Sequence, residues 1–403
     1  MKFPKSSEQI DIISKGVSEI ISIESLEKKI NFSIKANKPL NIKLGCDPSR
    51  PDLHIGHSVV LNKLRDFQDL GHSAILVIGD FTALIGDPSG RNKTRPKLSI
   101  EDVSNYSQTY IDQASKILDI KKLRIVKNAD WLGKMNFYDV INLSARYTVA
   151  RMLERDDFEK RYKSQIPISI HEFMYPLAQA MDSVQLNSDI ELGGTDQKFN
   201  LLVGRDLQKD YGQDPQVIIT SPILEGSDGV KKMSKSYNNY IGITHPPLEI
   251  YGKTMSIPDQ LIFTYFQLAT RIDGNELRII QKQISDNETN PRDLKRQLAR
   301  EIVSIYYDEE QAQYAETEFD NIFIHSEIPK NIDIWKITND NYHILTILND
   351  SGLVVSKREA RRLINQGAVS IDGEKIYDIN FNINKNRELV LKVGKRKFLK
   401  IIS

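Results

Sequence analysis

Two short motifs that are far apart in the chain carry residues suited to chemistry on phosphate groups. In "DLHIGH", at residues 52–57, His54 and His57 stand three positions apart, so on a helix they share one face. The first turn of a helix attracts anions, because its free N–H groups and the positive end of its dipole face outward. Imidazoles placed there can hold phosphate oxygens whose charge grows in a transition state. Ordinary capping or surface histidines would fit the same spacing, so this motif alone leaves both interpretations open.

The second motif, "KMSKS" at residues 232–236, begins 178 residues after His54. Lys232 and Lys235 lie in a loop with two glycines, where lysine side chains act as movable point charges on a polyphosphate. Taken alone, a Lys-Ser tract indicates an ordinary surface loop. The two motifs in this order are far more specific than either one, and together they favour a nucleotide phosphate as the ligand.

The elements around the first motif predict where it lies in the fold. Residues 41–46 read as a short apolar strand, and a Pro- and Asp-rich turn follows. A helical pattern then places apolar residues at i, i+4 and i+7 from Val60, until Gly71 ends it. The continuous apolar run at 73–80 suits a strand buried on both faces of a parallel sheet. This βαβ unit puts the histidines at the carboxyl end of the first strand, where such sheets bind ligands.

The rest of the chain extends this pattern into several predicted parts. The fold class is α/β, with a Rossmann-like, doubly wound parallel sheet at its centre. We expect a catalytic domain over 1–240 with a helical insertion at about 100–188, an α-helical region over 241–325, a linker over 326–340, and a small α+β basic domain over 341–403.

Composition excludes several classes of protein. The 403 residues are 40% hydrophobic and carry a net charge of +1, which is ordinary for a globular protein. The sequence shows neither the apolar core of a signal peptide nor a run of about 18 apolar residues, so we expect a cytoplasmic protein without a membrane span. The single cysteine, Cys46, rules out an internal disulfide and disfavours a cysteine-rich zinc site.

The carboxyl-terminal residues 341–403 are basic, with 12 Lys and Arg against 6 Asp and Glu. Ser356 can cap a helix, and a hairpin with its turn at Asp372-Gly373 follows that helix. The charge suggests a polyanion partner, although a solvated basic surface would give the same count. The helix carries four cations on one side, which makes them candidate RNA-binding residues: Lys357, Arg358, Arg361 and Arg362.

A polar stripe interrupts an otherwise apolar helical segment. Tyr175, Gln179 and Asp182 are spaced i, i+4 and i+7, so their side chains converge on one side of the helix. A buried hydrogen-bonded network would explain the stripe, and so would a pocket for a polar ligand.

Several quoted segments together carry a family resemblance. "GCDPSRPDLHIGH", "LIGDPSGR", "KNADW", "YPLAQAMDS", "GGTDQKFN" and "KMSKS" resemble the bacterial tyrosyl-tRNA synthetases, a family of class I aminoacyl-tRNA synthetases, over nearly the whole chain. The resemblance implies activation of L-tyrosine by ATP to tyrosyl-adenylate and pyrophosphate, then transfer to the 3′ end of tRNA(Tyr). It also implies Mg²⁺ with ATP, no prosthetic group, no metal site of the protein's own, and a homodimer formed through the inserted region.

The resemblance also implies roles for individual positions. The implied catalytic residues are His54, His57, Lys232 and Lys235. The implied ATP contacts are Gly45, Asp47, His54, Gly56, His57, Asp196, Lys232, Met233, Ser234 and Lys235, with Arg91 and Arg95 at the pyrophosphate. The implied tyrosine contacts are Asp80, Asp87, Asn128, Tyr175, Gln179, Asp182 and Gln197, with Asp182 accepting the phenolic hydroxyl.

Two departures and three rival functions accompany this resemblance. Lys43 stands where many members of the family have a tyrosine, and Asp80 stands in a corner that is often glycine-rich. A tryptophanyl-tRNA synthetase shares the motifs, but Asp182 and the basic tail favour tyrosine. A small-metabolite adenylyltransferase would leave "KMSKS" and the tail unexplained. A non-catalytic RNA-binding descendant would not need the complete set of motif residues.

Overall fold

The computed structural model describes residues 3–48, 52–89, 99–286, 289–323, 332–336, 341–384, 388–394 and 397–402. They form two compact units, Met1–Ala312 and Gln313–Ser403. The first unit is built on a six-stranded sheet with the strand order β1-β6-β5-β2-β3-β4. Its strands are β1 (Glu19–Ile21), β2 (Asn41–Cys46), β3 (Ser73–Ile78), β4 (Leu123–Lys127), β5 (Ile190–Gly194) and β6 (Val217–Ser221).

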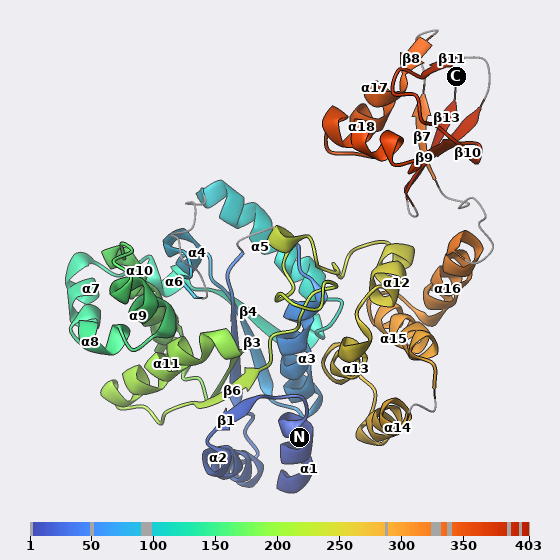
Figure 1. Cartoon of the computed structure of the whole chain (residues 1–403). Coiled ribbons are helices and arrows are strands. Elements are labelled where there is room, and N and C mark those ends of the chain that lie inside the picture. The colour runs from blue at the N-terminus through green and yellow to red at the C-terminus, as the bar shows by residue number, and fades with distance from the viewer. Residues whose placement is uncertain are drawn as a thin grey trace. The chain divides into compact units, whose positions relative to one another are not determined.

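Helices cover both faces of this sheet, as the Rossmann-like prediction requires (Figure 1). Strands β2 to β6 pair in parallel, and only β1 runs antiparallel, against β6. Helix α3 (Ile55–Asp69) packs on one face, and α10 (Ile170–Leu186) and α11 (Lys198–Asp210) pack on the other. Strands β3 and β6 are almost entirely buried, which explains their continuous apolar sequences.

The βαβ unit expected from the sequence is confirmed in detail. Leu64 and Phe67 of α3 are fully buried, so the apolar stripe faces the sheet. Gly71 adopts a φ of +90°, and the next amide, that of His72, donates to the carbonyl of Phe67 at 2.9 Å. A glycine is favoured there because side chains rarely tolerate a positive φ.

The expectation of a helical insertion at about 100–188 is correct only in part. Strand β4 lies inside this range and pairs in parallel with β3. It is the edge strand and is only partly buried, so it lacks the continuous apolar run that marks β3. The inserted helical segment, which we define as residues 129–163, contains α6 (Ala129–Leu132), α7 (Phe137–Ser144), α8 (Val149–Met152) and α9 (Asp156–Lys163).

Helices also fill the region from 241 to 323, as predicted. They are α12 (Pro247–Met255), α13 (Ile262–Ala269), α14 (Gly274–Ser285), α15 (Pro291–Tyr306) and α16 (Glu309–Phe323), which runs across the boundary between the units. The remaining helices of the first unit are α1 (Ser6–Ser14), α2 (Ile23–Ala36), α4 (Thr82–Ile85) and α5 (Ile100–Ala114). Short 3₁₀ turns are η1 (Ile120–Lys122), η2 (Thr195–Gln197), η3 (Lys235–Tyr237) and η4 (Asp259–Leu261).

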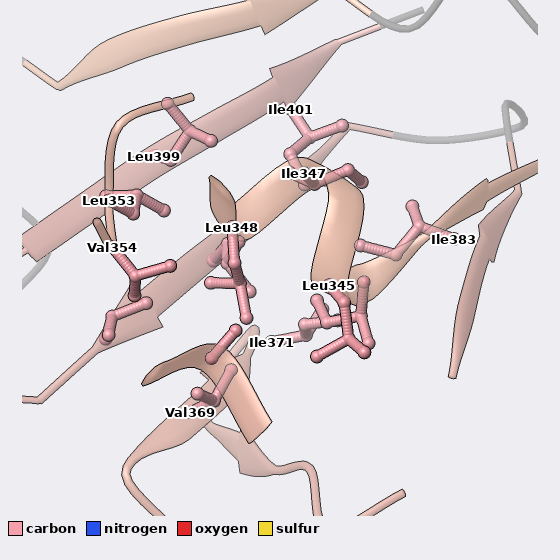
Figure 2. Packing of buried hydrophobic residues seen from close by; sticks show 14 of the residues in the cluster. Leu345, Ile347, Leu348, Leu353, Val354, Val369, Ile371, Ile383, Leu399 and Ile401 are labelled. Carbon is pink, nitrogen blue, oxygen red and sulfur yellow. The ribbon is translucent and has the colours of Figure 1, made fainter. Parts of the chain in front are cut away.

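The second unit has its own sheet and its own core. Five strands follow the order β10-β9-β12-β13-β7, and β11 pairs with β8. Aliphatic side chains from α17, α18 and the sheet form the core, including Leu348, Ile371 and Leu399 (Figure 2). Its elements are β7 (Asp333–Lys336), β8 (Asn341–His343), α17 (Ile344–Asp350), α18 (Lys357–Asn365), β9 (Val369–Ile371), β10 (Glu374–Lys375), β11 (Asn382–Asn384), β12 (Leu389–Val393) and β13 (Lys397–Ile402).

One boundary needs correction. Strand β7 falls within the predicted linker 326–340, yet it pairs in parallel with β13. The described part of that segment is therefore a strand of the carboxyl-terminal sheet, and the basic unit begins before Asn341. Polar residues and Pro329 disguise this strand in the sequence. The described residues contain no helix long and apolar enough to cross a membrane.

Candidate active site

A cavity of about 370 Å³ opens at the carboxyl ends of β2 and β5. The chain winds away in opposite directions from these neighbouring strands, toward β3 on one side and β6 on the other. Open α/β sheets bind ligands at such a switch point. The structure brings most of the sequence-predicted residues to its walls: Gly45, Asp47, His54, Gly56, His57, Asp87, Asn128, Tyr175, Gln179, Asp182, Asp196, Gln197, Lys232, Met233, Ser234 and Lys235.

The motifs at residues 52–57 and 232–236 are in direct contact. The amide of Gly56 donates to Sδ of Met233 at 3.4 Å, and Lys235 forms an ion pair with Asp52. A Cβ on Gly56 would lie 3.0 Å from Nδ1 of His54 and 3.5 Å from Cβ of Met233, so a side chain there would disturb both motifs. Contact between the two motifs therefore brings together segments whose residues His54 and Lys232 are 178 positions apart in the sequence.

His54 and His57 stack on each other at the beginning of α3, with ring centroids 3.8 Å apart. His57 Nδ1 accepts the amide of His54 at 3.2 Å. Burial lowers the pKa of His54 to about 2. His57 is more exposed to solvent, yet desolvation and the positive charge of Lys232 lower its pKa as well, so both rings are neutral near pH 7. A neutral imidazole still carries one N–H. His54 Nδ1 is buried and has no hydrogen-bond partner among the described residues, whereas His57 Nδ1 is already used.

Asp182 forms the floor of a second part of the cavity, and it is only 3% exposed. Its carboxylate accepts Trp131 Nε1 at 2.9 Å and Asn128 Nδ2 at 3.3 Å. Burial raises the pKa of Asp182 to about 7, although the positive charge of Lys43 opposes that rise. Two donors do not fill the four lone-pair positions of a carboxylate, so Asp182 can accept a further hydrogen bond from a ligand hydroxyl.

Oxygen acceptors gather in another part of the cavity. Asp87 Oδ2 accepts Gln197 Nε2 at 2.8 Å, and Asp87 Oδ1 accepts the amide of Ser89 at 2.8 Å. Gln179 Oε1 and Gln197 Oε1 both accept from Asn200 Nδ2 at 3.1 Å. A carboxylate beside two amide oxygens suits a cationic group such as an ammonium.

Between these parts, Asp47 is held by two hydroxyl groups. Tyr175 donates to Oδ2 at 2.8 Å, and Thr82 donates to Oδ1 at 2.7 Å. Gly79 makes this approach possible, because a Cβ there would lie 2.0 Å from Asp47 Oδ1. The sequence analysis missed Gly79, Thr82 and the Trp131 contact. Gly79 does end an apolar strand, which is the signal that could have identified it.

Three predicted residues are not placed at the cavity. Asp80 does not line it, because its Oδ1 accepts the amide of Ala129 at 2.9 Å and caps the start of α6. Its proposed contact with an amino group stays a prediction. Arg91 and Arg95 lie outside the described residues.

The cations proposed for RNA lie on α18 of the second unit. Ser356 caps this helix by accepting the amide of Glu359 at 3.2 Å, and Ala360 and Ile364 are fully buried. The four predicted cations are exposed: Lys357, Arg358, Arg361 and Arg362. Across the ranges that the structure describes, no group of three or more His, Cys, Asp or Glu is arranged to hold a metal ion.

Comparison with known proteins agrees with this geometry. Residues 35–324 match the family model "tRNA synthetases class I (W and Y)" and 324–401 match "Tyrosine–tRNA ligase SYY-like C-terminal domain". A tyrosine–tRNA ligase of Chlorobium chlorochromatii is 57% identical over 404 residues, covering 100% of both chains. One from Thermotoga maritima is 53% identical over 98% of this chain and 97% of its own. The tyrosyl-tRNA synthetase of Archaeoglobus fulgidus, solved with L-tyrosine, is similar in fold, with a TM-score of 0.64 at 22% identity over 77% of this chain and 99% of its own.

Proposed function

The chain belongs to the class I tRNA synthetases for tryptophan and tyrosine, and from this premise we infer that it is a tyrosine-tRNA ligase. It activates L-tyrosine with ATP to tyrosyl-adenylate and pyrophosphate, and it then transfers tyrosine to the 3′ end of tRNA(Tyr). Full-length relatives that carry this name support the assignment. The observation that carries the choice of tyrosine is the buried, incompletely paired carboxylate of Asp182.

We propose that the first step needs no protein nucleophile. The carboxylate of tyrosine attacks the α-phosphorus of ATP in line, and catalysis consists of positioning and of stabilising charge on the phosphate oxygens. The neutral rings of His54 and His57 are suited to donate to those oxygens as their charge increases. Lys232 and Lys235 line the same cavity and supply positive charge for the departing pyrophosphate.

The two ends of the cavity would bind the two ends of tyrosine. Asp182 accepts the phenolic hydroxyl, with Asn128 and Trp131 holding the carboxylate in place. Asp87 and Gln179 line the part of the cavity that contains several oxygen acceptors, and they accept hydrogen bonds from the amino group. Phenylalanine is disfavoured because it leaves the buried carboxylate of Asp182 without its ligand partner.

Mg²⁺ would enter together with ATP as part of the substrate. Because Mg²⁺ keeps several waters and is commonly held by substrate phosphates, it does not require an all-protein cage. The donors present at the cavity, carboxylates such as Asp196 and amide oxygens, are compatible with such a complex. We propose no prosthetic group.

The tRNA would contact the exposed cations of α18, because four positive side chains on one short helix suit a phosphate backbone. The chain's substrate tRNA is used in translation, so we propose that the enzyme acts in the cytoplasm.

We further propose a homodimer that uses the inserted helical segment and the start of α10. These elements expose large apolar side chains to an extent unusual for a monomer: Phe137 at 80%, Tyr138 at 71%, Ile141 at 49%, Val149 at 62% and Ile170 at 83%. Light scattering at micromolar concentration should give twice the mass of one chain, and a monomer would contradict the proposal.

The test of the proposed function is tyrosine-dependent exchange of pyrophosphate into ATP in the presence of Mg²⁺. We expect exchange with tyrosine and none with tryptophan. Exchange with tryptophan alone would reassign the enzyme to the tryptophan branch of its family. Exchange with neither amino acid, in a folded preparation, would refute the assignment, and tRNA charging separates a synthetase from another adenylyltransferase.

A further inference from the structure

A complete ion pair is buried beneath the amino-acid part of the cavity. Lys43 on β2 and Glu191 on the neighbouring strand β5 lie opposite each other in the sheet, with Nζ 2.8 Å from Oε1. Their side chains are 0% and 1% exposed. Burying two charges is costly, and a pair of this kind often contributes little or nothing to stability compared with apolar residues. Its presence next to a ligand site therefore calls for a functional explanation.

Every hydrogen-bonding position of the lysine ammonium is used. Besides Glu191, Lys43 Nζ donates to the backbone carbonyl of Gln179 at 3.0 Å and to Ser183 Oγ at 2.6 Å. The carboxylate of Glu191 is equally occupied, because it also accepts from Ser183 Oγ and Gln179 Nε2, both at 3.1 Å, and from Gln216 Nε2. The pair thus holds α10 from two sides, at its backbone and at the Gln179 side chain.

This arrangement determines which way the amide of Gln179 faces. An ionised carboxylate only accepts hydrogen bonds, so the NH₂ group of Gln179 must face Glu191. Its Oε1 therefore faces Asn200 Nδ2, which also donates to Gln197 Oε1. Asn200 has its NH₂ group between these two oxygens, and each oxygen keeps a second lone pair for another donor. Gln179, Gln197 and Asp87 line the same cavity.

We propose that Lys43 and Glu191 are positioning residues that fix Gln179 as an acceptor for the amino group of the substrate. This inference rests on the proposed function, in which the amino acid enters this cavity. Glu191 orients the amide, and Lys43 compensates the buried negative charge of Glu191. With neutral residues in both places, the amide could present either its oxygen or its NH₂ group to the cavity, and an NH₂ group repels an ammonium.

The inference distinguishes two ligands that differ in one group. Tyrosine carries the ammonium, whereas 3-(4-hydroxyphenyl)propionate has the same phenol, chain and carboxylate without it. A merely structural role would weaken both ligands alike. A positioning role weakens only tyrosine, by about tenfold for one hydrogen bond to a charged group.

The test is calorimetric binding of both ligands to the full chain and to the variant K43M/E191Q, which removes both charges at once. We expect tyrosine to bind about tenfold more weakly and the amino-free analogue to change by less than about twofold. The single variant E191Q, which keeps Lys43, is expected to shift the ratio in the same direction and serves if the double variant does not fold. Equal losses for both ligands, or an unchanged ratio in both variants, would overturn the inference.

A matched control lies elsewhere in the same unit. Arg161 and Glu172 form another ion pair with side chains only 2% and 3% exposed, and neither lines the cavity. The variant R161M/E172Q should lower stability without changing the ratio of the two affinities, and a matching change there would also overturn the inference. If the unmodified enzyme shows no tyrosine-dependent exchange, the proposed function fails; if it is active but the ratio is unchanged, only this inference fails.

Discussion

The protonation of Asp182 should control the capture of tyrosine near neutral pH. Burial raises the pKa of this carboxyl to about 7, from an ordinary value of 3.8. The phenolic hydroxyl must donate to an ionised carboxylate, and kcat/KM reports groups of the free enzyme. Below pH 7 the ionised fraction falls about tenfold per pH unit. We therefore expect kcat/KM for tyrosine to be constant above about pH 8, to fall about fivefold between pH 7 and 6, and to approach a tenfold fall per pH unit below that.

The neighbouring groups do not produce the same profile. His54 and His57 have pKa values lowered to about 2 and about 4, so they stay neutral over the tested range. Lys43 lowers and Glu191 raises the pKa of Asp182, and the two side chains form one buried ion pair. The step near pH 7 is therefore expected from Asp182, whose carboxyl lines the part of the cavity proposed for the phenol.

Unfolding without tyrosine gives an independent measurement of the same group. A carboxyl whose pKa is raised in the folded state stabilises the fold at low pH, and this contribution is lost as pH rises through about 7. Between pH 6 and 8 the loss amounts to about 1.4 kcal/mol. We expect the free energy of unfolding of the wild type, minus that of Asp182→Asn, to fall by this amount over the same interval.

The assays are pyrophosphate exchange at subsaturating tyrosine and urea unfolding, each from pH 5.5 to 8.5. Asp182→Asn should bind tyrosine weakly at every pH and should lose the step near pH 7. A flat wild-type profile down to pH 5.5, or a step that persists in Asp182→Asn, would show that another group titrates.

Three further predictions concern other parts of the enzyme. His57→Ala should lower kcat of exchange about 100-fold while KM for ATP changes less than about threefold, since the ring acts on charge that develops in the transition state. Substitution of the exposed His171 by alanine is the control. A variant in which only KM rises would contradict the role of His57. Gly79→Ala should destabilise the fold by about 2 kcal/mol or more and impair exchange, because its Cβ would meet Asp47 Oδ1 at 2.0 Å; an unchanged melting temperature would refute this. Removal of residues 324–403 should preserve pyrophosphate exchange but reduce tRNA charging at least tenfold, because about four cationic contacts with the RNA are lost. An equal loss of exchange and of charging would argue against a carboxyl-terminal segment that serves only tRNA binding.

Sequence reasoning succeeded where the signals are local. The continuous apolar run of β3 and the glycine at 71 determine one βαβ unit without reference to the rest of the chain. The hairpin at Asp372 and Gly373 is equally local, because both residues adopt a positive φ. Edge strands were missed: β1 has three residues, β4 is only half-buried, and β7 is mostly exposed. Such strands carry too few buried positions to leave a pattern.

In the candidate site, the sequence predicted side chains that lie together on one helix or loop. It did not predict contacts between side chains from elements that are far apart in the chain. Asp182 was found from its place on the α10 stripe. The contact of Trp131 with Asp182 joins positions 51 residues apart, and no spacing rule reports it. The hydrogen bond that Asp80 Oδ1 accepts from the amide of Ala129 is likewise one that the sequence does not predict.

The buried charges of Lys43 and Glu191 affect two groups of the site, the carboxyl of Asp182 and the amide of Gln179. Lys43 lowers the pKa of Asp182, and Glu191 raises it, so the shifts caused by removing the two charges oppose each other. The same pair determines the orientation of Gln179, through hydrogen bonds that no compensating charge can replace. Neutralising the pair should therefore change recognition of the amino group, while its two opposed effects on the pKa of Asp182 partly offset each other. A buried ion pair is costly, but this one can orient Gln179 at the amino-group end of the pocket, while its two charges act in opposite directions on Asp182 at the phenol end.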